Sequence, residues 1–203
     1  MTSALAEGLR AHFSEQDLAR LASVRVGIAG AGGLGSNVAM LLARSGVRRF
    51  TVVDGDSVEP SNLNRQWYWP EDVGLPKVEA LRQRLLSLEP ALCLDVRREW
   101  LSPASARVLF QECSIVVEAL DAAVLKAEIC EALLESGCFV VAASGLGGCG
   151  LAPMAVRRLG THFVCVGDFV TEAGSAAPPL APRVTQAAAL QADAVLEHIL
   201  RKD

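Results

Sequence analysis

The sequence has few lysines, few aromatic residues and no excess of positive charge. Aromatic residues make up 5% of the 203 residues, and lysine occurs only at Lys77, Lys126 and Lys202. The formal net charge is −4, whereas proteins that bind nucleic acid usually carry a basic patch. We therefore do not expect a nucleic-acid partner.

Long hydrophobic runs are also missing. No apolar stretch reaches the roughly 18 residues that a membrane helix requires. The first residues, MTSALAEGLRAHFSEQD, carry charges where a signal peptide would need its apolar core. Because 51% of the residues are hydrophobic, the chain can still form a substantial core. We expect a globular cytoplasmic protein with no membrane partner.

The cysteines are unpaired in the sequence. All six occur singly, and no C-x-x-C motif is present. This pattern argues against a zinc site of the paired-cysteine type and, without a secretion signal, against a disulfide framework. Most of the cysteines are expected to be small buried hydrophobic residues.

Short apolar runs alternate with amphipathic stretches along most of the chain. The runs predict strands at 24–29, 49–53, 92–96, 115–118 and 139–142. The amphipathic stretches predict helices at 4–22, 34–45, 76–88, 103–112 and 122–136. Such alternation predicts an α/β fold with a Rossmann-like, mostly parallel sheet.

The last third of the chain departs from this alternation. Residues 154–158 and 163–166 flank a turn at 159–161, which predicts an antiparallel hairpin. A loop rich in small residues and proline over 174–182 leads to a predicted closing helix over 184–201. We therefore expect the sheet to carry an antiparallel C-terminal extension.

A glycine-rich loop follows the first predicted strand. It reads Gly30-Ala31-Gly32-Gly33-Leu34-Gly35, with the G-x-G-x-x-G spacing of nucleotide-binding loops. Its glycines allow a tight turn, close approach of the backbone to a phosphate, and close packing of helix on strand. Backbone N–H groups at the helix start would face the anion. Asp54 ends the second strand, where a carboxylate can bind ribose hydroxyls, but these features do not separate NAD, FAD and ATP.

The segment after Asp54 favours ATP. A dehydrogenase would normally enter a helix here, but this chain continues in a polar loop that contains Asn62, Arg65 and Gln66. Lys77 then stands at the start of a helix. Guanidinium and ammonium groups stabilise the charge that develops on a leaving pyrophosphate.

Asp121 follows the predicted strand 115–118. It would lie at the carboxyl edge of the sheet, where ligands of open α/β sheets bind. A carboxylate at this place can hold Mg²⁺ against phosphate oxygens. The alternative is that Asp121 caps the helix 122–136, and it could also do both.

These motifs resemble the ThiF/MoeB family, which is related to the ubiquitin-activating enzymes. The matching segments read G-x-G-G-L-G-S, D-x-D-x-V-x-x-S-N-L-N-R-Q and G-x-x-K, followed by Asp121. The resemblance covers residues 24 to about 145 and implies one ThiF-type domain over 1–203. Its predicted parts are an N-terminal helix, a nucleotide-binding core, and antiparallel strands with a closing helix, at 1–23, 24–145 and 146–203.

The resemblance implies a reaction. The family uses MgATP to adenylate the C-terminal glycine of a small ubiquitin-like protein and releases pyrophosphate. V-C-V-G-D, A-P-R-V and Q-A-D near the end of the chain resemble short ThiF-type proteins of thiamine biosynthesis. The implied partners are a ThiS-like sulfur carrier and a sulfur donor protein.

The resemblance also implies residue roles. Nucleotide binding would fall to the four glycines Gly30, Gly32, Gly33 and Gly35, and to Asp54, Asp56, Asn62, Arg65, Gln66 and Lys77. Catalysis would fall to Arg65, Lys77 and Asp121, with Asp121 holding Mg²⁺. Attack by a carboxylate on the α-phosphorus needs positioning and charge neutralisation but no side-chain nucleophile.

The chain departs from the family pattern at several places. Zinc-binding members carry two C-x-x-C pairs, so we predict no zinc here. We expect a homodimer. In many members the second arginine of an N-terminal R-Y-x-R-Q segment reaches the ATP of the partner subunit, but this chain has Glu15 in place of that arginine, and Arg10 or Arg20 could substitute. Cys165 and Cys149 are candidate thiols for a covalent bond to the carrier.

Three other functions remain open from the sequence. The same chemistry could act on a molybdopterin-type carrier or on a carboxylate of tRNA. The chain could be a non-catalytic nucleotide-binding partner of an active subunit. An NAD-dependent oxidoreductase is a further alternative, although the chain is short for a separate substrate domain.

Overall fold

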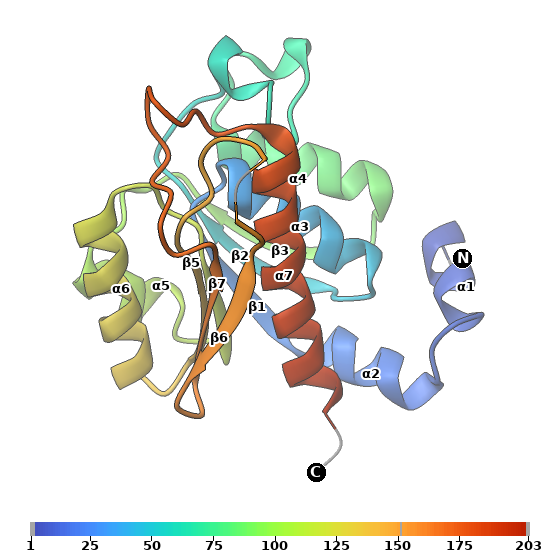
Figure 1. Cartoon of the computed structure of the whole chain (residues 1–203). Helices are drawn as coiled ribbons and strands as arrows, with labels where there is room; N and C mark the ends of the chain where they lie inside the picture. Colours follow the sequence, from blue (N-terminus) through green and yellow to red (C-terminus); the bar gives the residue numbers. More distant parts are fainter. Residues whose placement is uncertain (1–2, 151, 202–203) are drawn as a thin grey trace.

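The computed structural model describes residues 3–150 and 152–201 (Figure 1). In this part of the chain, strands form one seven-stranded sheet of order β3-β2-β1-β4-β5-β7-β6. The strands are β1 (Arg25–Ala29), β2 (Arg49–Val53), β3 (Cys93–Arg97), β4 (Ile115–Glu118), β5 (Phe139–Ala143), β6 (Ala155–Leu159) and β7 (Phe163–Gly167). Neighbouring strands are parallel except β6 and β7. The predicted α/β fold with a mostly parallel sheet is confirmed.

Helices cover both faces of the sheet. They are α1 (Ala4–Arg10), α2 (Glu15–Ser23), α3 (Gly33–Arg44), α4 (Lys77–Leu88), α5 (Pro103–Leu109), α6 (Ala123–Glu135) and α7 (Ala181–Leu200). In Figure 1, α7 crosses α3 in front of the sheet, and α5 and α6 lie together on the other side.

The strand residues alternate between two cores. Ile115 and Val117 of β4 pack with residues of α3, α4 and α7, whereas Val116 packs with residues of α5 and α6 such as Ile129. Such alternation follows from the two-residue period of a strand. Because both faces are covered, the central strands read as continuous apolar runs.

The C-terminal hairpin extends the main sheet. As predicted, β6 and β7 are antiparallel, with Leu159 opposite Phe163. The pairing of β7 with β5 is parallel, which the sequence did not reveal. Val164 and Val166 of β7 are buried, whereas all residues of β6 are exposed at the edge of the sheet.

Three predicted helix boundaries are wrong, and one of them is the end of the helix expected over 103–112, which stops at Leu109. The single helix expected over 4–22 is two helices, because the Ser14 side chain accepts a hydrogen bond from the N–H of Asp17 (3.1 Å) and begins α2 anew. The closing helix begins at Ala181 rather than at 184. Pro182 lies in its first turn, where the missing N–H of proline costs no hydrogen bond.

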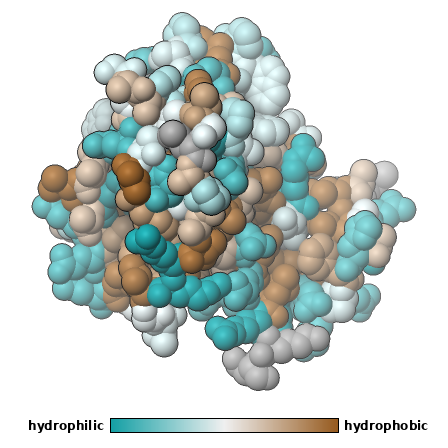
Figure 2. Space-filling view, viewed as in Figure 1, coloured by the Kyte–Doolittle hydropathy of each residue, from teal (hydrophilic) through white to brown (hydrophobic). Residues whose placement is uncertain are grey.

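Hydrophilic and hydrophobic residues are intermixed on the face shown in Figure 2. The exposed large hydrophobic side chains include Trp100 and Val170, which follow the carboxyl ends of β3 and β7, and Leu159, which is the last residue of β6. Among the described helices, none has the length and apolar character needed to span a membrane.

A buried ion pair joins α7 to the segment after β7. Arg183 Nη2 lies 2.6 Å from Asp168 Oδ2, and Asp168 Oδ1 accepts hydrogen bonds from the N–H groups of Val170 (2.9 Å) and Thr171 (2.8 Å). Burial alone would raise the pKa of Asp168. The two N–H groups and the guanidinium outweigh it and hold this pKa below its ordinary value.

We predict that Asp168→Ala lowers the free energy of unfolding by about 3–5 kcal/mol, because it leaves a guanidinium buried without its counter-charge. Asp193→Ala is the matched control, since Asp193 is exposed on α7. Urea denaturation at pH 7 measures both. Because the pKa of Asp168 is depressed by folding, the difference from wild type should shrink as pH falls below about 4. Equal stability of the two variants would contradict the prediction.

Candidate nucleotide-binding site

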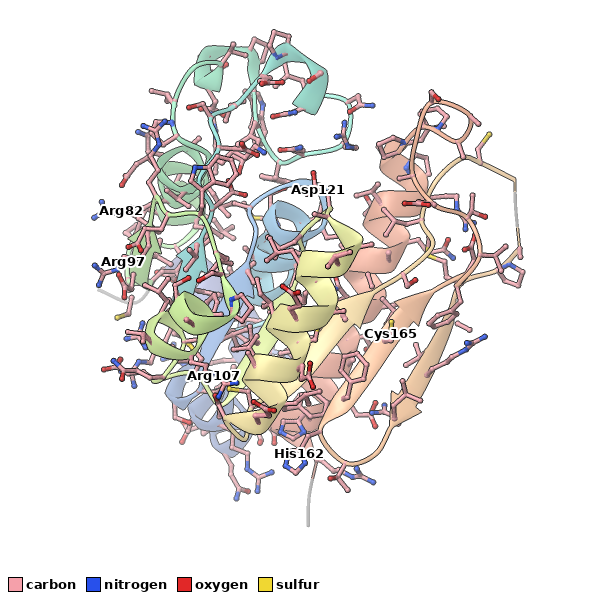
Figure 3. The ribbon with its side chains drawn as sticks, turned by 90° about the vertical axis from the view of Figure 1, so that its left-hand side faces the viewer. Arg82, Arg97, Arg107, Asp121, His162 and Cys165 are labelled. Atoms are coloured by element: carbon pink, nitrogen blue, oxygen red, sulfur yellow. The ribbon has the colours of Figure 1, made fainter. Side chains whose placement is uncertain are left out.

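A cleft of about 730 Å³ opens at the carboxyl edge of the sheet. Its walls come from the segments that follow β1, β2, β3, β4, β5 and β7. Ligands of open α/β sheets bind at this edge. Figure 3 shows Asp121 there, at the start of α6, and His162 at the opposite end of the molecule.

Most of the predicted site residues line this cleft. They are Gly30, Gly32, Gly33, Asp54, Asp56, Asn62, Arg65, Gln66, Lys77 and Asp121. Gly35 packs beneath the glycine loop. A Cβ on Gly35 would lie 1.8 Å from the carbonyl oxygen of Gly30, so no other residue fits. The glycine loop thus forms a cradle of backbone groups for a phosphate, and the first turn of α3 is directed at the cleft.

Asp54 connects the glycine loop to the loop after β2. Its Oδ2 accepts a hydrogen bond from the N–H of Ala31 (2.7 Å), and its Oδ1 accepts one from the N–H of Asp56 (2.7 Å). Each carboxylate oxygen retains a second lone pair, so Asp54 can still accept hydrogen bonds from ribose hydroxyls.

Lys77 and Asp56 form an ion pair inside the cleft. Lys77 Nζ lies 2.7 Å from Asp56 Oδ2, and the N–H of Lys77 donates to the carbonyl of Asp56 (2.9 Å). The Lys77 side chain is 9% exposed and that of Asp56 is 48% exposed. Lys77 and Asp56, both of which were expected to contact the nucleotide, thus contact each other.

The polar segment around Arg65 turns toward the glycine loop. Asn62 Oδ1 accepts a hydrogen bond from the N–H of Glu59 (3.1 Å), which holds the turn, and Arg65 Nη1 donates to the carbonyl of Ser61 (3.0 Å). Gln66 is buried, and its Oε1 has no hydrogen-bond partner among the described residues. A buried amide without a partner, beside a glycine cradle, fits a polar ligand such as a nucleotide.

Asp121 is exposed at the rim of the cleft. Ala122 is the N-cap of α6 and makes no side-chain capping bond, so the alternative that Asp121 caps this helix is wrong. In the part of the chain that the structure describes, no group of three acidic, histidine or cysteine side chains could hold a metal ion. One carboxylate still suits Mg²⁺, which commonly takes its other ligands from phosphates and water.

A buried ion pair supports the turn that carries Asp121. Lys126 Nζ lies 3.0 Å from Glu118 Oε2 and donates to the carbonyl of Leu120 (2.9 Å), and Glu118 Oε1 accepts from the N–H of Leu120 (2.6 Å). Glu118 is fully buried. Burial raises the pKa of Glu118, although the neighbouring Lys126 opposes this effect.

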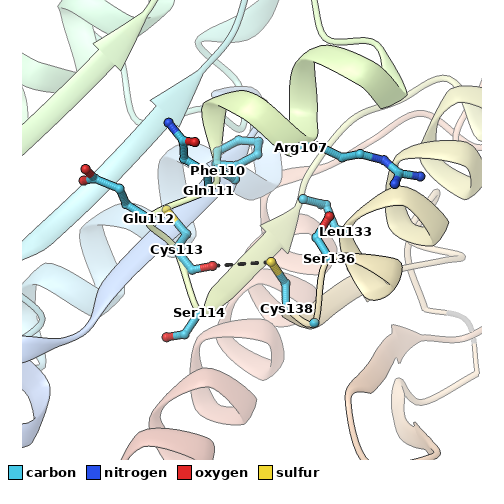
Figure 4. Close-up of a pocket in the computed structure, with 10 residues that line it drawn as sticks. Arg107, Phe110, Gln111, Glu112, Cys113, Ser114, Leu133, Ser136 and Cys138 are labelled. Atoms are coloured by element: carbon cyan, nitrogen blue, oxygen red, sulfur yellow. Dashed lines mark hydrogen bonds between the residues drawn. The ribbon is translucent and has the colours of Figure 1, made fainter.

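The two candidate thiols are not among the described residues that line the cleft. Cys165 is half-buried in β7 (Figure 3), and burial raises its pKa, which disfavours the reactive thiolate. Cys149 is exposed in the loop after β5. A second cavity of about 280 Å³ lies at the opposite edge of the sheet (Figure 4), where the Cys138 thiol donates to the carbonyl of Cys113 (3.3 Å). It contains none of the motif residues.

Sequence reasoning missed several residues of the cleft. They are Trp100 and Leu101 after β3, Lys126 in α6, the segment 144–146, and Phe169, Val170, Glu172 and Ala173 after β7. Trp100 had a detectable signal, since it closely follows a predicted strand at the edge where ligands bind. The segment after β7 had none, because its position depends on the pairing of β7 with β5.

Residues 6–203 match the ThiF family. The chain belongs to this family. It is 34% identical over 126 residues to adenylyltransferase and sulfurtransferase UBA4 from Yarrowia lipolytica, covering 62% of this chain and 32% of the relative. It is 40% identical over 77 residues to ubiquitin-like modifier-activating enzyme 5 from Caenorhabditis elegans, covering 38% and 18%. The chain thus spans about a third or less of the length of these curated relatives.

Solved structures share the fold. One is E. coli tRNA N6-threonylcarbamoyladenosine dehydratase, TcdA, in complex with ATP, with a TM-score of 0.87, 20% identity, and coverage of 98% of this chain and 97% of that one. Another is E. coli MccB with ATP, with a TM-score of 0.72, 22% identity, and coverage of 90% and 57%.

We predict that Lys126→Met lowers the free energy of unfolding at pH 8 by about 3 kcal/mol, because Glu118 is then buried without its counter-ion. The double variant with Glu118→Gln should recover most of the loss. Since burial without Lys126 raises the pKa of Glu118 in the folded state, the loss should be smaller near pH 5, where this carboxyl binds a proton. Additive losses in a double-mutant cycle would contradict this coupling.

We predict that a maleimide reagent modifies Cys149 faster than Cys165, because Cys149 is exposed and the pKa of the half-buried Cys165 is raised. Cys93 is exposed and provides the reference rate. Peptide mass spectrometry over time at pH 7.5 measures each site. Modification of Cys165 as fast as that of Cys149 would contradict the prediction.

Proposed function

We propose that this cleft binds MgATP and that the chain transfers the adenylyl group of ATP to a carboxylate, with release of pyrophosphate. The observation that carries the proposal is the convergence of Arg65, Lys77 and Asp121 on a glycine cradle within one cleft. Two cations and one carboxylate around a phosphate cradle suit phosphoryl chemistry.

Each group has a role in the proposed reaction. The glycine loop and the start of α3 bind phosphates through N–H groups, and Asp54 orients the ribose. Arg65 and Lys77 stabilise the negative charge on the phosphates, for which Lys77 Nζ must exchange Asp56 for a phosphate oxygen. Asp121 holds Mg²⁺, which neutralises further charge when it is bound.

The bond changes need no protein nucleophile. An oxygen of the acceptor carboxylate forms a bond to the α-phosphorus, and the bond between the α-phosphorus and the bridging oxygen breaks. Pyrophosphate leaves with that electron pair, and an acyl-adenylate remains. The chain contributes alignment of the two reactants and a preorganised positive field.

The acceptor we favour is the C-terminal glycine of a small ubiquitin-like sulfur carrier of the ThiS type, in thiamine thiazole synthesis. The thiamine assignment rests on the motifs at the end of the chain. The name of the ubiquitin-like modifier-activating enzyme 5 relative supports a small protein acceptor, and that of the adenylyltransferase and sulfurtransferase UBA4 supports adenylation and sulfur transfer. A tRNA carboxylate is the second candidate, since TcdA aligns over nearly the whole chain. The net charge of −4 favours the protein carrier.

We predict that the protein catalyses ATP–pyrophosphate exchange with Mg²⁺ and one carrier that ends in Gly-Gly. Lys77→Ala and Asp121→Ala should each lower the exchange rate about 100-fold or more, because each removes a charge that stabilises the transition state. Glu128→Ala is the matched control, since Glu128 is exposed on α6 and does not line the cleft.

The panel of acceptors separates the alternatives. Exchange that requires tRNA and no carrier would replace the favoured acceptor with the second candidate. Binding of ATP without exchange for any acceptor would instead indicate a non-catalytic subunit. Full activity of both cleft variants would contradict the assignment of the site.

A further inference from the structure

Trp100 is an exposed aromatic residue inside the cleft. It follows β3, lines the cleft and is 76% exposed. Ligand pockets are commonly lined by aromatic side chains, which offer a large apolar contact area to the ligand. Neither the glycine cradle nor the charged residues described above involve it.

One face of the Trp100 indole rests on Gly55. A Cβ on Gly55 would lie 2.5 Å from Cδ2 and 2.6 Å from Cε2 of the ring, so a side chain there would displace the indole. Gly55 is not in the left-handed region of φ, so this contact, not the backbone conformation, requires glycine. Since the backbone covers one face and the side chain is mostly exposed, the opposite face is open to the cleft.

The segment that leads from β3 to Trp100 is hydrogen-bonded to the loop after β2. The N–H of Asp54 donates to the carbonyl of Arg97 (3.1 Å), and Arg98 Nη2 donates to Ser57 Oγ (3.4 Å). These bonds, together with the contact of the indole with Gly55, place Trp100 beside the loop that carries the candidate ribose ligand Asp54.

The strand order sets the direction in which a nucleotide would lie. The glycine cradle follows β1, Asp54 follows β2, and Trp100 follows β3, and these strands are successive neighbours in the sheet. Adjacent strands are about 4.8 Å apart. A nucleotide with its phosphates at β1 and its ribose at β2 thus directs its base toward the end of β3.

We propose that the open face of Trp100 stacks against the base of the bound nucleotide. This inference rests on the proposed function, since it adds a base-binding residue to the same site. Stacking on an indole depends on the area of the base and uses no hydrogen bonds. The larger purine face should therefore bind more tightly than a pyrimidine.

The test compares ATP, CTP and inorganic tripolyphosphate as ligands of the full chain with Mg²⁺. ATP should quench tryptophan fluorescence in wild type and in Trp69→Phe, a control whose ring contacts Arg84 outside the cleft. In Trp100→Ala, quenching should be lost and calorimetry should show ATP affinity reduced about 5- to 100-fold. Tripolyphosphate affinity should be unchanged, and Trp100→Phe should restore most of the ATP affinity.

The outcomes distinguish this inference from the function on which it rests. If Trp100→Ala binds ATP as tightly as wild type, or loses ATP and tripolyphosphate affinity equally, the stacking role is overturned and the ATP site stands. If wild-type protein binds neither ATP nor tripolyphosphate, the proposed function fails and this inference fails with it. Because Trp100 is exposed, its replacement should leave the thermal unfolding temperature near that of wild type.

Discussion

The close contact between α3 and β1 is the constraint on which the cleft depends. The helix begins at Gly33, and Gly35 lies so near the carbonyl of Gly30 that a Cβ would approach it within 1.8 Å. A Cβ on Gly30 would in turn meet the carbonyl of Ala119, after β4, at 2.7 Å. Backbone thus packs on backbone at two successive places, and the N–H groups of the glycine loop are left facing the cleft.

The C-terminal segment supports the same cleft from behind. Gln191 of α7 donates to the carbonyl of Glu118 (2.9 Å) at the end of β4 and to that of Val141 (3.2 Å) in the middle of β5. Val184, also in α7, lines the cleft beside Gly33. The closing helix is therefore part of the architecture of the cleft, and a change in its packing would reach the turn that carries Asp121.

Local signals in the sequence predicted the features that a few consecutive residues determine. The glycine loop, Asp54 at a strand end and Lys77 at a helix start were all placed correctly at one edge, because parallel strands bring their carboxyl ends together. Contacts between distant segments were not predictable: the pairing of β7 with β5 joins strands whose apolar pattern fits several neighbours. The N-cap at Ser14 is also a local signal, but the prediction missed it because the apolar pattern of the helix expected over 4–22 continues through this position.

The two ion pairs at the cleft, Lys77–Asp56 and Lys126–Glu118, differ in the burial of their carboxylates, and this gives the two lysines different roles. Asp56 is about half exposed, so it can release Lys77 and be hydrated at little cost when a phosphate arrives. Glu118 is fully buried, and release of Lys126 would leave its carboxylate without water or a counter-ion. The cleft thus contains two ammonium groups of the same charge, but only that of Lys77 can be transferred to a phosphate at small cost. Lys126 remains committed to the turn beside Asp121, where its positive charge adds to the field of the cleft without direct contact.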